Sequence, residues 1–312
     1  MRSWNVCDLK EVLGPERGRF FGEGYRKVQY GANRRSACNP RGATYDCSVD
    51  YPEDWSITPM GNPRQPHLST VDATILPLLG IEYAMSAGPA NESMPRFHVS
   101  ELELRSGNQP WNDLQSVPMS IRPVETNHSE HKYRATVGNI DTKLTLRKGP
   151  TGSTQEDPEA DPAQGTPYGS FYRFTECRST IESYSNDDRE ATGSHRFTTT
   201  LKPYGCPRGI EGSVWPAVSI ADYLVTMGQM VQALVQLQHG TGRAGTLWMR
   251  SVSVTRAGLP SPLPTTLQSH VSITRDRLVR LRERHFRDLR ISAQISDGTR
   301  VSASLAQEEG AQ

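Results

Sequence analysis

The sequence has few cysteines, and none of them are spaced as a metal-binding or redox pair. The cysteines are Cys7, Cys38, Cys47, Cys177 and Cys206, an odd number without a Cys-x-x-Cys motif. This pattern argues against a disulfide framework and against a zinc site. We therefore expect a reduced, cytoplasmic protein that uses no metal or redox cofactor.

Long apolar runs and an excess of charge of either sign are also missing. No stretch reaches the ~18 apolar residues of a transmembrane helix, and residues 1–8 lack the apolar core of a signal peptide. Lysine and arginine number 35 against 34 aspartate and glutamate residues, for a formal charge of +1. Such a balance creates no global field toward nucleic acid or membranes, so neither is an expected partner.

What the sequence does contain is an internal repeat. Pro66–Asp72 and Pro216–Asp222 share the pattern Pro-x-apolar-Ser-x-x-Asp, and Phe21–Arg26 matches Tyr168–Arg173 as aromatic-Gly-x-x-Tyr-Arg. A third echo is the alternation of Leu102 and Leu104, which falls at the same offset as Val252 and Val254. The offsets are 150, 147 and 150 residues. A period this long indicates a duplicated domain rather than a solenoid.

The length of 312 residues also favours two domains. Residues 150–166 are rich in Gly, Pro, Thr, Gln and acidic side chains and carry no large apolar ones, which is typical of a linker. We therefore expect a first domain over 1–149, a linker over 150–166, a second domain over 167–306 and a disordered tail over 307–312.

Alternation of apolar and polar residues predicts six strands in each half. In the first half we expect strands over 24–31, 43–50, 97–105, 116–123, 131–137 and 140–147. In the second half we expect them over 170–183, 194–202, 245–256, 266–274, 277–284 and 287–305. Gly138-Asn139 and Asp297-Gly298 mark hairpin turns near the end of each half.

One long helix is expected between the second and third strands of each half. Ser219 is a good N-cap, Asp222 can reach back to its N–H, and an apolar run then continues to Gln238. The first half starts its helix in the same way at Ser69. Because Pro77 lies inside that helix and would remove a backbone hydrogen bond, we expect a kink or break there.

A long buried helix wrapped by a curved antiparallel sheet describes the hotdog fold, and two such halves describe a double hotdog. We therefore expect an α+β protein of this type, with the two sheets joined edge to edge. Such a junction would also cover a sheet edge that would otherwise stay open.

Three strings in the first half resemble one known family. Arg19–Arg26, Tyr51–Trp55 and Pro66–Ala73 are similar to the avirulence protein D family, best known from plant-pathogenic bacteria, with relatives in soil actinomycetes. The overall length fits as well. The resemblance implies a part in making syringolides, acylated sugar-derived lactones that act as signals. It brings no catalytic residues with it, so the roles below rest on chemistry.

The resemblance implies an acyltransferase or condensing enzyme in biosynthesis of a syringolide- or butenolide-type signalling lactone. It would join a 3-oxoacyl group, delivered by acyl carrier protein or coenzyme A, to a sugar or other polyol such as a pentulose. A hotdog dehydratase or thioesterase acting on the same thioesters is one alternative, and a non-catalytic acyl-lactone binding protein is another. The sequence leaves open whether the chain forms a homodimer.

His67 is the leading candidate for a catalytic residue. Acyl transfer needs a base for the accepting hydroxyl and donors for the thioester oxygen, and a helix N-terminus supplies such donors. His67 directly precedes the first helix and is replaced by Ala217 in the second copy. We expect His67 to be the general base, Asp72 to orient it or bind substrate hydroxyls, and Ser69 to contact the substrate. The alternative is that His67 is a loop residue and Asp72 only a cap.

Four other residues are candidates with an equally available structural role. Glu23, between two glycines and absent from the second copy, could be a second acid or base or could bind sugar hydroxyls. Glu82 could face the cavity, and Trp215 could wall an acyl tunnel. Tyr25 is a candidate for substrate binding, although its duplication as Tyr172 favours a structural role.

Arginines form two further patterns. Arg26 and Arg173 are duplicated together with the two helix-start aspartates, so we hypothesise that each arginine pairs with the aspartate of its own half. The segment Arg275–Arg290 carries seven arginines. A solvated, charge-protected sheet edge is the simplest interpretation. Docking of a phosphopantetheine phosphate or of an acidic carrier protein is the functional one.

Overall fold

The computed structural model describes residues 7–35, 42–58, 61–86, 97–149, 172–200, 209–240, 247–281 and 284–309. The linker expected over 150–166 lies outside these ranges. Cys7, Cys47 and Cys177 are free thiols in this part of the chain.

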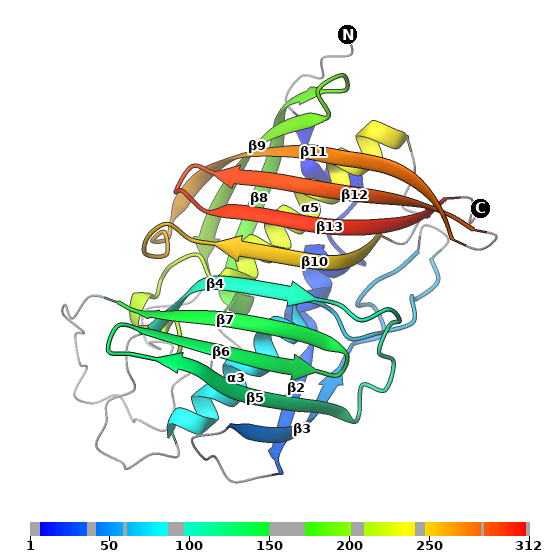
Figure 1. The fold of residues 1–312 in the computed structure, drawn as a ribbon. Helices are drawn as coiled ribbons and strands as arrows, with labels where there is room; N and C mark the ends of the chain where they lie inside the picture. The colour runs from blue at the N-terminus through cyan, green and yellow to red at the C-terminus, as the bar shows by residue number, and fades with distance from the viewer. Residues whose placement is uncertain are drawn as a thin grey trace.

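The described strands form one antiparallel sheet of 13 strands (Figure 1). Its order is β1-β8-β9-β11-β12-β13-β10-β4-β7-β6-β5-β3-β2. The first half contributes β2 (Gln29–Arg34), β3 (Ala43–Asp50), β4 (Phe97–Arg105), β5 (Val117–Thr126), β6 (Glu130–Val137) and β7 (Ile140–Lys148). The second contributes β8 (Thr175–Ser185), β9 (Glu190–Thr199), β10 (Leu247–Thr255), β11 (Thr265–Leu281), β12 (Arg284–Ile295) and β13 (Arg300–Glu309). The short β1 (Cys7–Asp8) pairs with β8.

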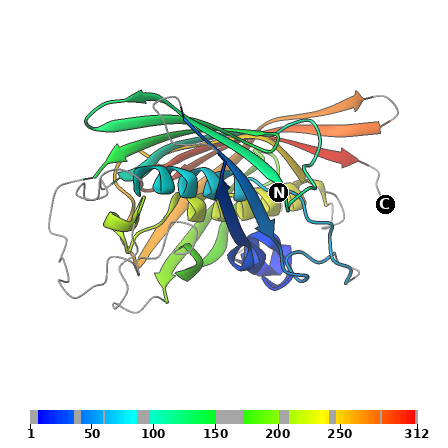
Figure 2. The ribbon, with the colours of Figure 1, turned by 90° about the horizontal axis from the view of Figure 1, so that it is seen from below.

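Two long helices, α3 (Asp72–Ser86) and α5 (Ile220–His239), lie on one face of the sheet (Figure 2). Most of their side chains are buried, because the sheet curves around them and covers helices that are apolar on nearly all sides. Short elements are α1 (Leu9–Leu13), the π-helical turn η1 (Phe20–Gly24), α2 (Tyr25–Lys27), η3 (Tyr172–Phe174) and η4 (Gly212–Val214). None of the described helices is long and apolar enough to cross a membrane.

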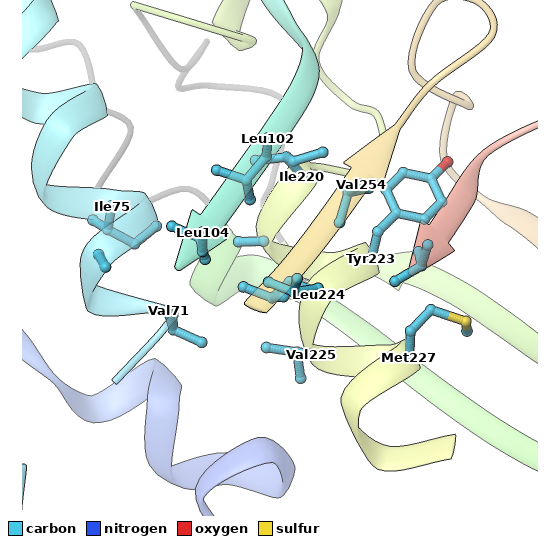
Figure 3. Packing of buried hydrophobic residues seen from close by; sticks show 14 of the residues in the cluster. Val71, Ile75, Leu102, Leu104, Ile220, Tyr223, Leu224, Val225, Met227 and Val254 are labelled. Carbon is cyan, nitrogen blue, oxygen red and sulfur yellow. The ribbon is translucent and has the colours of Figure 1, made fainter. Parts of the chain in front are cut away.

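The two halves repeat one arrangement of elements. In each half the long helix follows the second strand, and the strands lie in the order first, second, fourth, fifth, sixth, third. The third strands, β4 and β10, pair with each other, with Leu104 opposite Val252 and Leu102 opposite Val254. This crosswise pairing of equivalent residues is what a local twofold axis between two copies produces. The side chains join one core that continues into the first turns of both long helices (Figure 3).

This mainly antiparallel α+β arrangement, with a curved sheet around a long helix in each half, agrees with the hotdog fold expected from the sequence. Strands 43–50 and 97–105 are confirmed at both ends. Gly138 and Gly298 have φ angles of 56° and 84° in the hairpin turns expected there. Glycine adopts this left-handed conformation without strain.

The break that was one of the two outcomes expected at Pro77 does not occur, and α3 is continuous from Asp72 to Ser86. A proline leaves the carbonyl of the residue four positions earlier, Ala73, without its helical donor. The Thr142 hydroxyl of β7 donates to that carbonyl at 3.1 Å. A tertiary hydrogen bond therefore replaces the missing helical one.

The first expected strand, 24–31, begins only at Gln29. The residues before it form η1 and α2, which fold back against the following loop. A Cβ on Gly22 would lie 2.3 Å from the Glu16 carbonyl oxygen, and one on Gly24 would lie 2.0 Å from that of Trp55. The glycines thus permit close backbone contact, not a strand.

Two expectations in the second half also differ from the structure. The tail expected from residue 307 is ordered to Glu309, because β13 pairs with β10 on one side and β12 on the other. The strands expected over 266–274 and 277–284 are one strand, β11, with a bulge between Ile273 and Arg275. β12 pairs with it on both sides of the bulge, whereas β9 pairs with it only up to Ser272.

The repeated Tyr-Arg motifs cross between the halves. Tyr25 stacks on Tyr172 with ring centroids 5.8 Å apart, and Arg173 donates to the carbonyl of Val28 in the first half. Burial raises the pKa of Asp222 to about 6, with hydrogen bonds from the N-cap serine and the nearby charge of Arg26 opposing it. The hypothesis that each arginine pairs with its own aspartate is therefore wrong: Arg26 lies near the aspartate of the other half.

Candidate functional site

The three strings that carry the family resemblance converge on one place. Phe20 of η1 lies 5.9 Å from Tyr51 and 5.4 Å from Trp55, measured between ring centroids. The Tyr51 and Trp55 rings are 4.8 Å apart, and Trp55 is 6.1 Å from the His67 ring. Residues separated by up to 47 positions in the sequence, from 20 to 67, thus form one aromatic cluster beside His67.

His67 lies half-buried between two indole rings. Trp55 contacts it from the first half, and Trp248 of β10 contacts it from the second at 5.6 Å between ring centroids. The imidazole Nδ1 is 3.4 Å from the Gln65 carbonyl oxygen. Trp248 is 36% exposed, and His67 is itself only half-buried, so the pair lies near the protein surface and not in the core.

His67 lines a large hollow that involves both halves. Near His67 the hollow is lined by Trp55, Arg64, Ser69, Thr70 and Trp248, and along α5 by the apolar side chains of Phe21, Leu224, Met227, Val231 and Val235. Its volume of about 2390 Å³ exceeds the roughly 300–1,000 Å³ of a ligand pocket. The excess arises because the hollow continues past the end of β4 onto the outer face of the sheet. We call it the His67 hollow.

The turn η1 is seated on α5 beside this hollow. Buried Arg19 donates through Nη1 to Oε1 of Gln229 at 3.1 Å and through Nε to the Pro15 carbonyl at 2.9 Å. Phe21 rests where α5 has Gly228, since a Cβ there would lie 2.7 Å from the ring. The first half therefore supplies one wall against the helix of the second.

Asp72 caps α3 and is fully buried. Its Oδ2 accepts from the Ser69 N–H at 2.6 Å and from the Tyr51 hydroxyl, and its Oδ1 accepts from the Tyr30 hydroxyl at 2.8 Å. Burial raises the pKa of Asp72, with these hydrogen bonds opposing the shift. The Asp72 N–H in turn donates to Ser69 Oγ at 3.2 Å, which completes a capping box.

The structure therefore connects Asp72 to His67 only indirectly. The Tyr51 hydroxyl contacts both the Asp72 carboxylate and the His67 carbonyl oxygen, the latter at 3.2 Å. In the described part of the chain, no hydrogen bond joins the carboxylate to the imidazole. Asp72 holds the backbone that carries His67 and does not line the His67 hollow, and the expected contact with the imidazole is not found.

The start of α3 keeps two free backbone donors. The N–H groups of Ala73, Thr74 and Ile75 donate to carbonyls one turn earlier. Those of Thr70 and Val71 have no acceptor among the described residues, as expected for the first positions of a helix. Thr70 lines the His67 hollow. Unpaired donors and the positive end of the helix dipole therefore lie close to His67.

The corresponding end of α5 is closed. The N–H of Ile220, which corresponds to Thr70, donates to Oε2 of Glu211 at 3.2 Å. Glu211 Oε1 accepts from Arg256 Nη1 at 2.5 Å, and each side chain is only 2% exposed. With Ala217 in the place of His67, the second half has neither the imidazole nor a free N–H at the position of Thr70.

The remaining candidates lie away from the His67 hollow. Glu23 is on the π-helical turn, and Tyr25 is buried in its stack on the opposite half. Glu82 is 5% exposed and accepts from the Ile210 N–H at 2.8 Å, so it holds the loop before α5. Trp215 packs against the core. None of these four lines the hollow.

Sequence reasoning missed five residues that shape the two helix starts, and three of them had no signal in the sequence. No sequence pattern identifies Trp248 as a site residue, because nothing in its strand indicates a contact with His67, 181 positions away. No sequence pattern identifies Tyr30 or Glu211 either. Tyr51 and Trp55 could have been found, because they stand in a string that carries the family resemblance. In the described part of the chain, no cluster of three or more His, Cys, Asp or Glu could hold a metal ion.

These motifs belong to a recognised family. The family model described as Pseudomonas avirulence D protein (AvrD) matches residues 5–308. The chain belongs to the AvrD family. The resemblance seen in three short strings is thereby confirmed over nearly the whole length. No curated protein sequence matches the chain significantly.

Solved structures with a similar course of the chain include three thioesterase-related proteins. The TesB protein of Mycobacterium avium subspecies paratuberculosis is 11% identical, with a TM-score of 0.45 over 96% of this chain and 99% of that one. The acyl-CoA thioesterase II TesB2 of Mycobacterium marinum is 11% identical, with a TM-score of 0.42 over 96% of each chain. The 12:0-ACP thioesterase of Umbellularia californica is 9% identical, with a TM-score of 0.40 over 90% and 94%. Likenesses this weak carry no argument about activity.

Proposed function

We propose that this AvrD-family protein is an acyltransferase that joins a 3-oxoacyl thioester to a hydroxyl of a sugar-like polyol. Membership of the family supports an acylated sugar-derived product. The observation that carries the proposal is the juxtaposition of the half-buried His67 with the free N–H group of Thr70 at one hollow. A base beside oxyanion donors is what acyl transfer to a hydroxyl requires.

Each group has one task in the proposed reaction. His67 removes the proton from the polyol hydroxyl as its oxygen attacks the thioester carbonyl. The N–H group of Thr70 donates to the carbonyl oxygen, which gains charge as the C–O bond forms. The C–S bond then breaks, and the leaving thiolate takes the proton from the imidazolium. The products are an ester and a thiol, and no cofactor is consumed.

Different parts of the hollow would bind the acyl chain and the polyol acceptor. The apolar side chains of Phe21, Leu224, Met227 and Val231 would contact the acyl chain along α5. The indoles of Trp55 and Trp248 would bracket the polyol beside the imidazole. An apolar wall with a few polar groups at its opening is the usual composition of a small-molecule site.

We further propose that the two halves are two hotdog domains, 1–149 and 167–306, of which only the first keeps a working site. The buried Glu211 carboxylate stands at the start of α5 where a thioester oxygen would have to bind. A fixed negative charge there opposes an oxyanion, and no imidazole replaces His67. One site per chain follows.

The test is incubation of the full chain with a 3-oxoacyl thioester, with and without a pentulose, followed by mass spectrometry. Ester formed only with pentulose supports transfer. Free acid in both reactions would indicate a thioesterase, an enoyl product a dehydratase, and unchanged thioester a binding protein; each would refute the proposal.

His67→Ala should lower the rate of transfer by about 10²-fold or more, the usual contribution of a general base. The matched control is His128→Ala, because His128 is exposed in the turn between β5 and β6 and does not line the hollow. Full turnover by His67→Ala would remove the proposed base.

A further inference from the structure

The outer face of the sheet, opposite to the helices, carries pairs of arginines in directly facing positions. Arg122 of β5 is opposite Arg134 of β6, and Arg275 of β11 is opposite Arg290 of β12. Like charges in facing positions destabilise a sheet. Arg122, Arg134 and Arg290 are exposed. Arg275 is paired with Asp288, whereas the other three arginines have no ion-pair partner among the described residues, which suggests that an anion neutralises them.

Between these pairs the outer face of the sheet carries short side chains. Arg105 of β4, Ser251 of β10, Ser304 of β13 and Arg290 of β12 are consecutive partners across four strands. At ~4.8 Å per strand, the two arginines are ~14 Å apart with two serines between them. A parallel row two residues along each strand continues the floor with Ser253, Ser302 and Ser292. The result is a groove with a small hydroxylated floor and arginines on both sides.

The carboxylates on this face pair with other cations, Arg275 among them, and leave four of the arginines without an ion-pair partner within the described ranges. Glu103 pairs with Lys143 at 2.6 Å, Asp288 with Arg275 at 2.9 Å, and Glu308 with Arg284 at 3.2 Å. Asp141 is opposite Arg105 in the sheet and accepts from the Thr136 hydroxyl at 3.0 Å. Arg105, Arg122, Arg134 and Arg290 have no ion-pair partner in the part of the chain that the structure describes.

The groove is continuous with the His67 hollow. Ser251, Ser304, Arg105 and Arg290 all line that hollow. Trp248, which contacts His67, precedes Ser251 on the same strand by three residues, or roughly 10 Å at strand spacing. An extended ligand could therefore lie with one end at His67 and the other on the arginines.

We propose that this arginine groove binds the phosphate groups of a coenzyme A thioester. The inference rests on the proposed function in one respect, that a thioester is the donor. Arginine forks suit phosphate oxygens, and two arginine flanks suit a ligand with phosphates at both its diphosphate and its 3′ position. A carrier protein delivers a single phosphate on its prosthetic arm and would leave the second flank unmatched.

The test measures binding without turnover. Titration calorimetry of the full chain with coenzyme A and with adenosine 3′,5′-bisphosphate should give saturable binding. Binding should weaken when ionic strength is raised from about 0.1 M to 1 M, because the Debye length falls from about 10 Å to 3 Å. The Arg105→Ala/Arg290→Ala double variant should raise Kd at least ~10-fold for both ligands, since each loses charge-assisted hydrogen bonds.

The matched control is Arg196→Ala, which removes one exposed arginine of β9 that does not line the groove. Its Kd should stay within about twofold of the parent. Equal binding by the double variant and the parent would overturn the proposal. So would the absence of coenzyme A binding combined with carrier-protein binding that the double variant loses. Unchanged far-UV circular dichroism separates loss of the groove from loss of the fold.

The outcomes distinguish this inference from the proposed function. His67→Ala should bind adenosine 3′,5′-bisphosphate like the parent, since this ligand lacks the arm that reaches the imidazole. Binding through the arginines without ester formation would refute the transferase and leave the groove standing. Ester formation from a thioester that binds equally well without Arg105 and Arg290 would do the reverse.

Discussion

Replacing Glu211 by Gln should destabilise the protein more than any surface change, because the carboxylate is the counter-charge of a buried arginine. Glu211 Oε1 accepts from Arg256 Nη1 at 2.5 Å and from the Val99 N–H at 3.3 Å. Arg256 also donates to the carbonyls of Val99 and Val218, at 3.0 and 2.9 Å. The network thus joins β4 of the first half to the start of α5 in the second.

The backbone supports the same conclusion. Glu211 has a φ of 64°, a left-handed conformation that costs a non-glycine residue about 1–2 kcal/mol. The contacts of the side chain must exceed this cost for the conformation to persist. A residue held in this way is placed for its side chain and not for its backbone preference.

The magnitude follows from what remains after the substitution. Gln keeps the shape and an acceptor but removes the negative charge that faces the buried Arg256 guanidinium. Removing one member of a buried pair costs about 3–5 kcal/mol. At about 2–4 °C per kcal/mol for a chain of this size class, Tm should fall by roughly 6–20 °C.

Thermal unfolding of the parent, Glu211→Gln, Arg256→Met and the double variant, followed by circular dichroism, completes a double-mutant cycle. The double variant should be less destabilised than the sum of the two singles, because it leaves no unpaired charge. A Tm for Glu211→Gln within a degree of the parent would refute the reasoning, as would strict additivity in the cycle. Exposed Glu53→Gln serves as the control and should leave Tm unchanged.

Two further predictions concern stability. Thr142→Val should lower the free energy of unfolding, measured with urea, by about 1–3 kcal/mol, because the Ala73 carbonyl loses its replacement donor. In a Pro77→Ala background the helical N–H is restored, so the same substitution should cost little. An equal cost in both backgrounds would contradict the role given to Thr142. Burial lowers the pKa of His195 to about 4. Keeping His195 neutral costs the folded protein nothing above pH 6.5. As the pH falls toward 4, the free energy of unfolding should drop by about 3 kcal/mol, because the pKa of His195 is ~2.5 units lower in the folded than in the unfolded state. His195→Gln should therefore show a smaller loss of unfolding free energy between pH 7 and pH 4.5 than the parent, and parallel pH profiles would contradict it.

Local features were predictable where one stretch of chain decides them. The strands at 43–50 and 97–105 follow from alternation, which the burial keeps over 43–50 and from Glu101 to Arg105. The N-caps at Ser69 and Ser219 follow from side chains that bond their own helix start. The duplication, and the family through three short strings, were readable for the same reason.

The assignment of roles within the site could be predicted only in part. His67 was found because it stands beside a helix start in one copy alone. Asp72 was given a part in chemistry, yet it is buried under Tyr30 and Tyr51, which approach from separate segments. Pro77 was expected to break its helix, yet a threonine from β7 supplies the lost bond.

The sequence by itself thus determined the elements, their repetition and the family, because these depend on neighbours within a few residues. Only the tertiary structure decided that the Tyr-Arg motifs cross between halves, that Trp248 faces His67, and that Glu211 closes the second helix start. Each of these contacts joins residues far apart in the chain. Their energies depend on burial and on partners, which no local pattern of side chains encodes.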